Sequence, residues 1–165
     1  MRPRRQQPGP GQESVWDYPR PPRLEESSEA IEIVLGGVAI ARSSVSWRVL
    51  ETSHPPTYYL PRAAFLDEVL VPVAGRHTVC EWKGRASYFD VVAGGRVAEA
   101  AAWTYPEPTP RFEVIRDAVA VMPGEMDRCV VDGETVAPQA GGFYGGWITS
   151  RVVGPFKGEP GTWGW

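Results

Sequence analysis

The sequence has few of the residues from which metal and nucleic-acid sites are built. It contains two cysteines, Cys80 and Cys129, and neither belongs to a Cys-x-x-Cys pair, so a four-cysteine zinc site is excluded. It contains two lysines, and no basic stripe runs between its seven tryptophans. Its net charge of −3 gives no basic footprint for displacing counterions from nucleic acid. We therefore expect no metal, no other cofactor and no nucleic-acid partner.

Long apolar runs are absent as well. No stretch approaches the length that crosses a bilayer, and no apolar segment follows the charged residues 1–7 as it would in a secretory signal. We expect a soluble, cytoplasmic protein with reduced cysteines and no membrane partner. A homodimer is also compatible with the sequence.

The familiar catalytic motifs are missing. The chain has no Gly-x-x-x-x-Gly-Lys-Ser/Thr loop, no Gly-x-Gly-x-x-Gly turn, no His-Glu-x-x-His pair and no Gly-x-Ser-x-Gly elbow. These absences argue against the ordinary nucleotide-binding and hydrolase mechanisms.

Glycine and proline, by contrast, are abundant, with 18 and 17 residues, as in folds made of strands and tight turns. Three hairpins are predicted, with turns at Gly36-Gly37, Gly94-Gly95 and Asp132-Gly133, because these pairs adopt the positive φ angles of two-residue hairpin turns. One short helix is predicted after Pro61, over residues 64–70. The fold class is therefore mainly β, with antiparallel sheets and one short helix.

Composition divides the chain into three parts. Residues 1–26 form an N-terminal arm rich in proline and arginine, and its first dozen residues have the composition of a disordered segment. Residues 27–138 form a single β domain. Residues 139–165, here called the strap, combine glycine with large aromatic side chains. We expect the strap to pack on the domain, because linkers rarely carry large aromatic residues.

The segment CEWKGRASY, residues 80–88, gathers scarce residue types in one place. If it is a continuous strand, alternation puts Trp82 and Tyr88 on an apolar face and Lys83 among charged neighbours, solvated and paired with an acid. In the alternative, a bulge at Gly84 turns Lys83 into an aromatic pocket. There a lowered lysine pKa would suit anion binding or imine chemistry.

Two carboxylates that we expect to lie beside aromatic side chains are candidate functional groups. Alternation places Glu99 with Trp103 and Tyr105, and Glu51 with Trp47. Such a carboxylate either bonds to buried donors or works as an acid or base. His54 and His77 lack a recognisable catalytic partner, and we expect each to be exposed or to cap a turn. The candidate ligand-binding residues are Tyr58, Tyr59, Trp82, Tyr88, Glu99, Trp103 and Tyr105.

Three motifs resemble those of one bacterial and fungal family. They read ETSHPPTYYLP at residues 51–61, CEWKGxAxY at 80–88 and AWxYPxP at 102–108. The family is Domain of Unknown Function 427, sometimes labelled nucleotidyltransferase-like, and the resemblance covers roughly residues 30–138. It implies a β-tent fold, in which two antiparallel sheets meet at an angle.

Relatives of the β-tent fold include zinc-bearing methionine sulfoxide reductases and a cereblon-type ligand-binding domain. This chain lacks their paired zinc cysteines, so neither the metal nor the chemistry carries over. A nucleotidyltransferase would hold divalent metals on closely spaced carboxylates after a Gly-Gly turn. Here Gly36-Gly37 is followed by residues 38–41, VAIA, with no Asp-x-Asp.

Three functions are compatible with these residues. The first is a small-molecule-binding domain with an aromatic pocket whose polar groups are Glu51 and Lys83. The second is an enzyme, of nucleotidyl- or other group-transfer type, that uses Lys83 or Glu51 as a base or anion clamp. The third is an interaction or scaffold module that uses the arm and the strap as a partner-binding surface.

Overall fold

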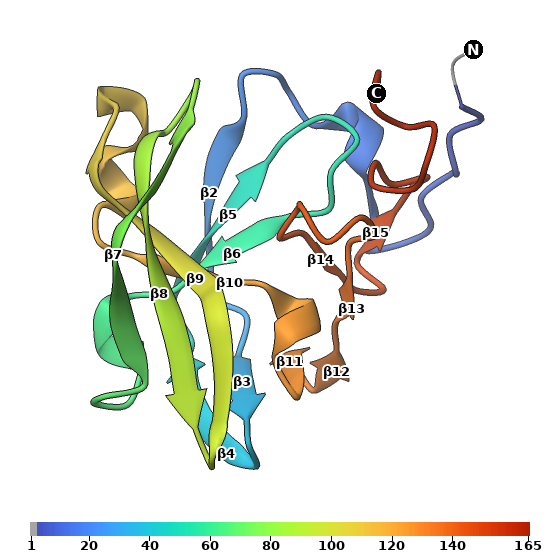
Figure 1. Ribbon diagram of the computed structural model, residues 1–165. Coiled ribbons are helices and arrows are strands. Elements are labelled where there is room, and N and C mark those ends of the chain that lie inside the picture. Colours follow the sequence, from blue (N-terminus) through green and yellow to red (C-terminus); the bar gives the residue numbers. More distant parts are fainter. Residues whose placement is uncertain (1–2) are drawn as a thin grey trace.

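Two four-stranded antiparallel sheets form the body of the protein, in a computed structural model that describes residues 3–165 (Figure 1). The strand orders are β10-β9-β8-β7 and β12-β11-β3-β4, and a three-stranded sheet, β2-β5-β6, adjoins them. Two separate two-stranded sheets complete the structure: β1 pairs in parallel with β15, which joins the two ends of the chain, and β13 pairs with β14. The strands are β1 (Glu13–Ser14), β2 (Arg23–Ser27), β3 (Ile31–Leu35), β4 (Val38–Ser43), β5 (Ser46–Leu50), β6 (Thr57–Tyr59), β7 (Leu70–Cys80), β8 (Gly84–Ala93), β9 (Arg96–Pro108), β10 (Val119–Val121), β11 (Arg128–Val131), β12 (Glu134–Thr135), β13 (Ala137–Pro138), β14 (Trp147–Ile148) and β15 (Val152–Val153). The mainly β class and its antiparallel sheets are confirmed.

The two larger sheets enclose a shared hydrophobic core. Ile33 and Ile40 enter it from β3 and β4, and Phe89 and Val91 enter it from β8. Trp147 of the strap is fully buried in the same core. Burial of such side chains is the largest favourable contribution to folding. The strap is therefore part of the folded unit.

Within residues 3–165, no helix has both the length and the apolarity to span a membrane.

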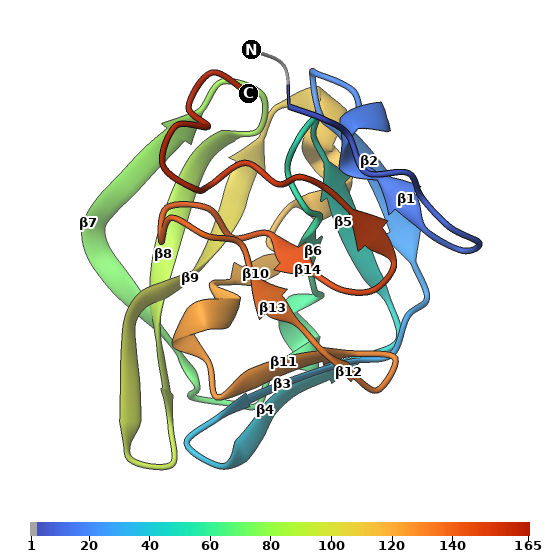
Figure 2. The ribbon, with the colours of Figure 1, turned by 90° about the vertical axis from the view of Figure 1, so that its right-hand side faces the viewer.

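All three predicted hairpins are present. β3 and β4, β8 and β9, and β11 and β12 pair across Gly36-Gly37, Gly94-Gly95 and Asp132-Gly133. All six turn residues have positive φ, between 48° and 80°. Figure 2 shows the two Gly-Gly turns next to each other at the lower edge of the molecule.

The short helix predicted after Pro61 is a single 3-10 turn, Arg62–Ala64, and further 3-10 turns lie at Val15–Asp17, Pro110–Ile115 and Pro123–Glu125. The turn ends because the N–H of Leu66 donates to the carbonyl of Ile40 on β4 rather than to residue 62. Glu68 then adopts a φ of 67°, and the chain enters β7. Pairing with the neighbouring strand therefore outweighs the local helical pattern.

Both ends of the chain pack against each other. Gln6 exchanges two hydrogen bonds with Gly154, through its backbone N–H and its side-chain carbonyl. This part of the arm was predicted to be disordered, and it instead lies along the strap. β2 begins at Arg23, so the β structure starts inside the predicted arm. Residues 1–2 of that arm lie outside the described residues.

Candidate functional site

A cavity of about 550 Å³ lies between the β7-β8-β9 sheet, β6 and the strap. Figure 2 looks onto this side, where the loop before β14 crosses β9. Each wall contributes a polar or aromatic side chain: Glu51 after β5, Tyr59 from β6, Lys83 between β7 and β8, Trp103 from β9 and Lys157 from the strap. The cavity is therefore built from segments far apart in the sequence.

Lys83 reaches the cavity because residues 81–83 form the turn of a hairpin. β7 ends at Cys80 and β8 begins at Gly84, whose φ is 109°. Thr109 holds the turn: its N–H donates to the Lys83 carbonyl at 3.0 Å, and its hydroxyl donates to the Trp82 carbonyl at 2.6 Å. The prediction that Lys83 lies in solvent on a continuous strand was therefore wrong. The chain bends next to Gly84, as the alternative required.

Lys83 remains a cation at neutral pH. Its ammonium lies 5.7 Å from the centre of the Tyr105 ring. Burial opposes the charge, but the neighbouring Tyr59, Cys80 and Glu51 outweigh it and raise the pKa of Lys83. Imine chemistry needs the free amine, so this environment favours anion binding instead.

Lys157, the only other lysine of the chain, lines the same cavity. Two backbone contacts fix its position: its N–H donates to the Ser53 carbonyl at 2.9 Å, and its carbonyl accepts from the Gln139 amide at 2.7 Å. Its ammonium lies 5.7 Å from the centre of the Tyr144 ring. The strap therefore adds a second cation to the wall.

His54 lies between Glu51 and Gln139. Its Nε2 is 3.5 Å from a Glu51 oxygen, and its Nδ1 is 3.1 Å from the Gln139 nitrogen. The Gln139 oxygen accepts from the Gly146 N–H at 3.1 Å, and this contact assigns the amide nitrogen to the His54 side. Nδ1 is therefore the acceptor, and Nε2 carries the proton that faces Glu51.

The same surroundings keep His54 neutral. Burial lowers its pKa to about 4; Glu51 acts in the opposite direction, while the positive charges of Lys157, Arg20 and Lys83 add to the lowering. At neutral pH the 3.5 Å contact with Glu51 is therefore one between a carboxylate and a neutral imidazole, and it is not an ion pair.

This depressed pKa predicts a loss of stability in acid. In the unfolded chain the histidine binds its proton below pH 6.5, and in the folded protein only below about 4. The contribution of the neutral His54 to the free energy of unfolding is therefore complete above pH 6.5 and is lost as the pH falls from 6.5 to about 4. Between pH 7.5 and 4.5 it amounts to about 2.5 kcal/mol. Urea unfolding at both values should show a loss smaller by about this amount in His54→Asn than in the wild type. Equal losses in the two proteins would contradict the assignment.

The aromatic wall is fixed by its own contacts. The indole N–H of Trp103 donates to the hydroxyl of Tyr59 at 3.1 Å, and the Tyr59 and Tyr105 ring centres are 6.3 Å apart. Burial raises the pKa of Tyr105, so this phenol stays protonated and remains a donor. Gly145 of the strap lies against Trp103, where a Cβ would be 2.3 Å from the ring.

Several predicted site residues are brought together in the cavity. They are Glu51, Tyr59, Lys83, Tyr88, Trp103 and Tyr105.

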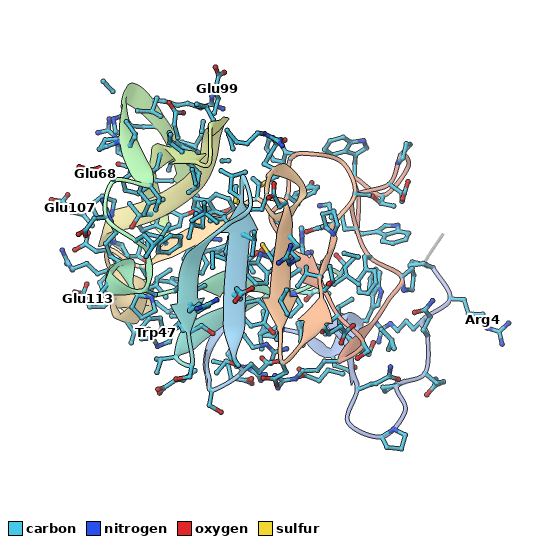
Figure 3. The ribbon with its side chains drawn as sticks, turned by 90° about the horizontal axis from the view of Figure 1, so that it is seen from below. Arg4, Trp47, Glu68, Glu99, Glu107 and Glu113 are labelled. Carbon is cyan, nitrogen blue, oxygen red and sulfur yellow. The ribbon has the colours of Figure 1, made fainter. Side chains whose placement is uncertain are left out.

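Three other candidates lie elsewhere. Tyr58 is in the main core, 4.9 Å from the Trp147 ring centre, and its hydroxyl donates to Glu29. Trp82 belongs to the turn itself; it packs against the hydrophobic cluster that contains Tyr105 and does not line the cavity. Glu99 is exposed and points away from the body (Figure 3). Its predicted alignment with Trp103 was wrong, because Ala100 adopts a φ of 48° in a bulge that resets the alternation.

Several lining residues were not found from the sequence, among them His54, Gln139, Tyr144 and Lys157. His54 was expected to be exposed or to cap a turn, and the other three lie in the strap. The sequence held one signal for Lys157: it is one of only two lysines in the chain, and it lies in the aromatic-rich strap.

The fold and the site together define a mainly β domain with a polar, aromatic-lined cavity that the strap helps to enclose. Among residues 3–165 there is no cluster of three potential metal ligands. The family model described as "Domain of unknown function (DUF427)" matches residues 23–132, and the chain belongs to this family. No curated protein matches the chain significantly. The matched region ends before the strap, so Gln139 and Lys157 lie outside it.

Proposed function

We propose that the protein binds a small molecule in the cavity. The observation that carries the proposal is the meeting of both lysines of the chain in one aromatic-lined cavity. Cavities of a few hundred Å³ with aromatic walls and a few polar groups are the usual form of ligand sites. The Tyr59 and Trp103 side chains hold each other in place, which preorganises the wall.

A thermal-shift screen of metabolites and nucleotides tests this proposal. A ligand at 100 times its Kd stabilises the native state by about 2.7 kcal/mol, which raises the Tm of a domain of this size by several degrees. The rise should be absent in Trp103→Ala, which removes part of the wall. Trp82→Ala is the matched control, because Trp82 lies beside the cavity without lining it. Hits that stabilise Trp103→Ala as strongly as the wild type, or a screen without any hit, would contradict the proposal.

An enzyme is the second candidate, favoured by the arrangement of Glu51, His54 and Lys83 on one cavity. In this interpretation Glu51 is the base, and the ammonium of Lys83, which lines the same cavity, is the anion clamp. A ligand from the screen should then be converted by the wild type and bound unchanged by Glu51→Gln. Recovery of the intact ligand after prolonged incubation with the wild type would favour binding alone.

The scaffold alternative has two exposed aromatic side chains of the strap in its favour, Phe143 and Trp163. The other tryptophans of the arm and the strap pack within the molecule: Trp16 lies on Trp165 with ring centres 5.5 Å apart, and Trp147 is fully buried. A homodimer stays a prediction.

A further inference from the structure

The cavity has an excess of positive charge in a chain whose net charge is −3. Lys83 and Lys157 line its walls, and Arg76 lies at its exposed rim over the Tyr88 ring. The one carboxylate among the lining residues is Glu51. Its oxygen lies 3.3 Å from Arg20, so this negative charge already has a cationic partner.

Neither lysine has such a partner within the part of the chain that the structure describes. No carboxylate of residues 3–165 lies within 4.0 Å of either ammonium group. The two described arginines that are not exposed do have one: the buried Arg48 and the half-buried Arg151 are each paired with glutamates. A half-buried ammonium with no carboxylate in contact can still pair with one, so an anion supplied from solution would complete the site.

The rest of the cavity wall suits a ligand whose uncharged part is aromatic. Trp103, Tyr105 and Tyr144 present aromatic rings, and the protonated phenol of Tyr105 can donate a hydrogen bond. A volume of about 550 Å³ accommodates a molecule of one or two rings with an acidic group.

We propose that the cavity selects small molecules that combine a planar, apolar body with an oxyanion, carboxylate or phosphate, and that Lys83 and Lys157 hold the oxyanion. This inference rests on the proposed function and names the ligand class of the same site.

Cys80 provides a reporter for the test. It lines the cavity and is only partly buried, whereas Cys129 is buried in the core, where desolvation raises its thiol pKa to about 12. Iodoacetamide should therefore alkylate Cys80 and leave Cys129 unmodified, and peptide mass spectrometry separates the two. A bound probe should slow the alkylation of Cys80.

The probes are benzoate, phenyl phosphate and benzamide, which share a ring and differ in the acidic group. Benzoate and phenyl phosphate should slow the alkylation of Cys80, and benzamide should not. The anion that protects at lower concentration shows whether the site prefers a carboxylate or a phosphate, and either preference supports the proposal. The protection by both anions should require roughly 10- to 100-fold higher concentration in Lys83→Met and in Lys157→Met.

The controls separate charge from packing. Lys83 is close to Cys80, so each variant is compared with itself, with and without probe. Arg85→Met removes an exposed cation that does not line the cavity, and it should leave protection unchanged. Circular dichroism verifies the fold of each variant, and Lys157→Met tests the idea independently should Lys83→Met not fold.

Two results would overturn the proposal. Equal protection by benzamide, unaffected by the lysine variants, would leave a ligand site with no preference for oxyanions, so the proposed function would survive. If neither anion protects Cys80 and the metabolite screen finds neutral ligands, the oxyanion preference is likewise wrong and the proposed ligand site survives. Failure of the probes and of the whole screen together would remove both proposals.

Discussion

Gly94→Ala should lower the free energy of unfolding by about 4 kcal/mol, whereas Gly95→Ala should lower it by about 1 kcal/mol. Both glycines have positive φ, 54° and 77°, so an added Cβ strains the backbone at either position. At Gly94, however, the Cβ would lie 1.9 Å from the carbonyl oxygen of Gly36, while nothing lies within 4 Å at Gly95. The contact is backbone on both sides, so no side-chain rotation relieves it.

Urea unfolding of the two variants measures this difference at adjacent positions. The reciprocal pair gives an independent check: a Cβ on Gly36 would lie 2.2 Å from the Ala93 oxygen, and one on Gly37 meets nothing within 4 Å. Gly36→Ala should therefore resemble Gly94→Ala, and Gly37→Ala should resemble Gly95→Ala. If the alanine variants at 94 and 95 are equally stable, the two hairpin turns are not in contact in solution.

The hairpins themselves could be predicted because their signals are local. A Gly-Gly or Asp-Gly pair specifies the turn through the φ angles of two adjacent residues, and the flanking apolar residues specify the strands. The contact between Gly36 and Gly94 belongs to the packing of two sheets. No pattern within either hairpin contains that information.

Alternation predicted the facing of side chains correctly only where the strands are regular. It placed Trp103 and Tyr105 on one face, and both line the cavity. It failed for Lys83 and Glu99, where the chain turns or bulges and the two-residue period is interrupted. Glycine can indicate such a turn, but Ala100 carries no comparable signal.

The contacts of His54 could not be predicted from its neighbours. They depend on Gln139, whose orientation is fixed by Gly146 and by the backbone of Lys157. The contact between His54 and Gln139 joins two segments separated by most of the β domain, and the other two contacts lie within the strap. A single sequence shows that the strap is rich in aromatic residues, but it does not show where these residues dock.

Arg48→Met should lower the free energy of unfolding by about 3 kcal/mol, the lower end of the cost of breaking a buried ion pair. Arg48 is fully buried, and its guanidinium bonds Glu25 at 2.6 Å, Glu13 at 3.1 Å and the Tyr18 hydroxyl at 3.3 Å. Methionine replaces the apolar stem without the charge, so the two glutamates lose their buried partner. Their partial exposure to water keeps the cost from being larger.

The matched control is Arg42→Met, because Arg42 bonds Glu32 at 2.8 Å on an exposed surface. Exposed pairs contribute less than about 1 kcal/mol, and urea unfolding should rank the two variants accordingly. Arg48→Lys separates charge from geometry: a lysine cannot donate in the same fork to both glutamates, so its stability should fall between those of the wild type and Arg48→Met. Glu13 belongs to the arm and also bonds Arg151 of the strap. Arg48→Met therefore removes one of the polar contacts of the arm and leaves the Glu13–Arg151 pair in place. A variant as stable as Arg42→Met would show that the buried ion pairs of Arg48 contribute little to stability.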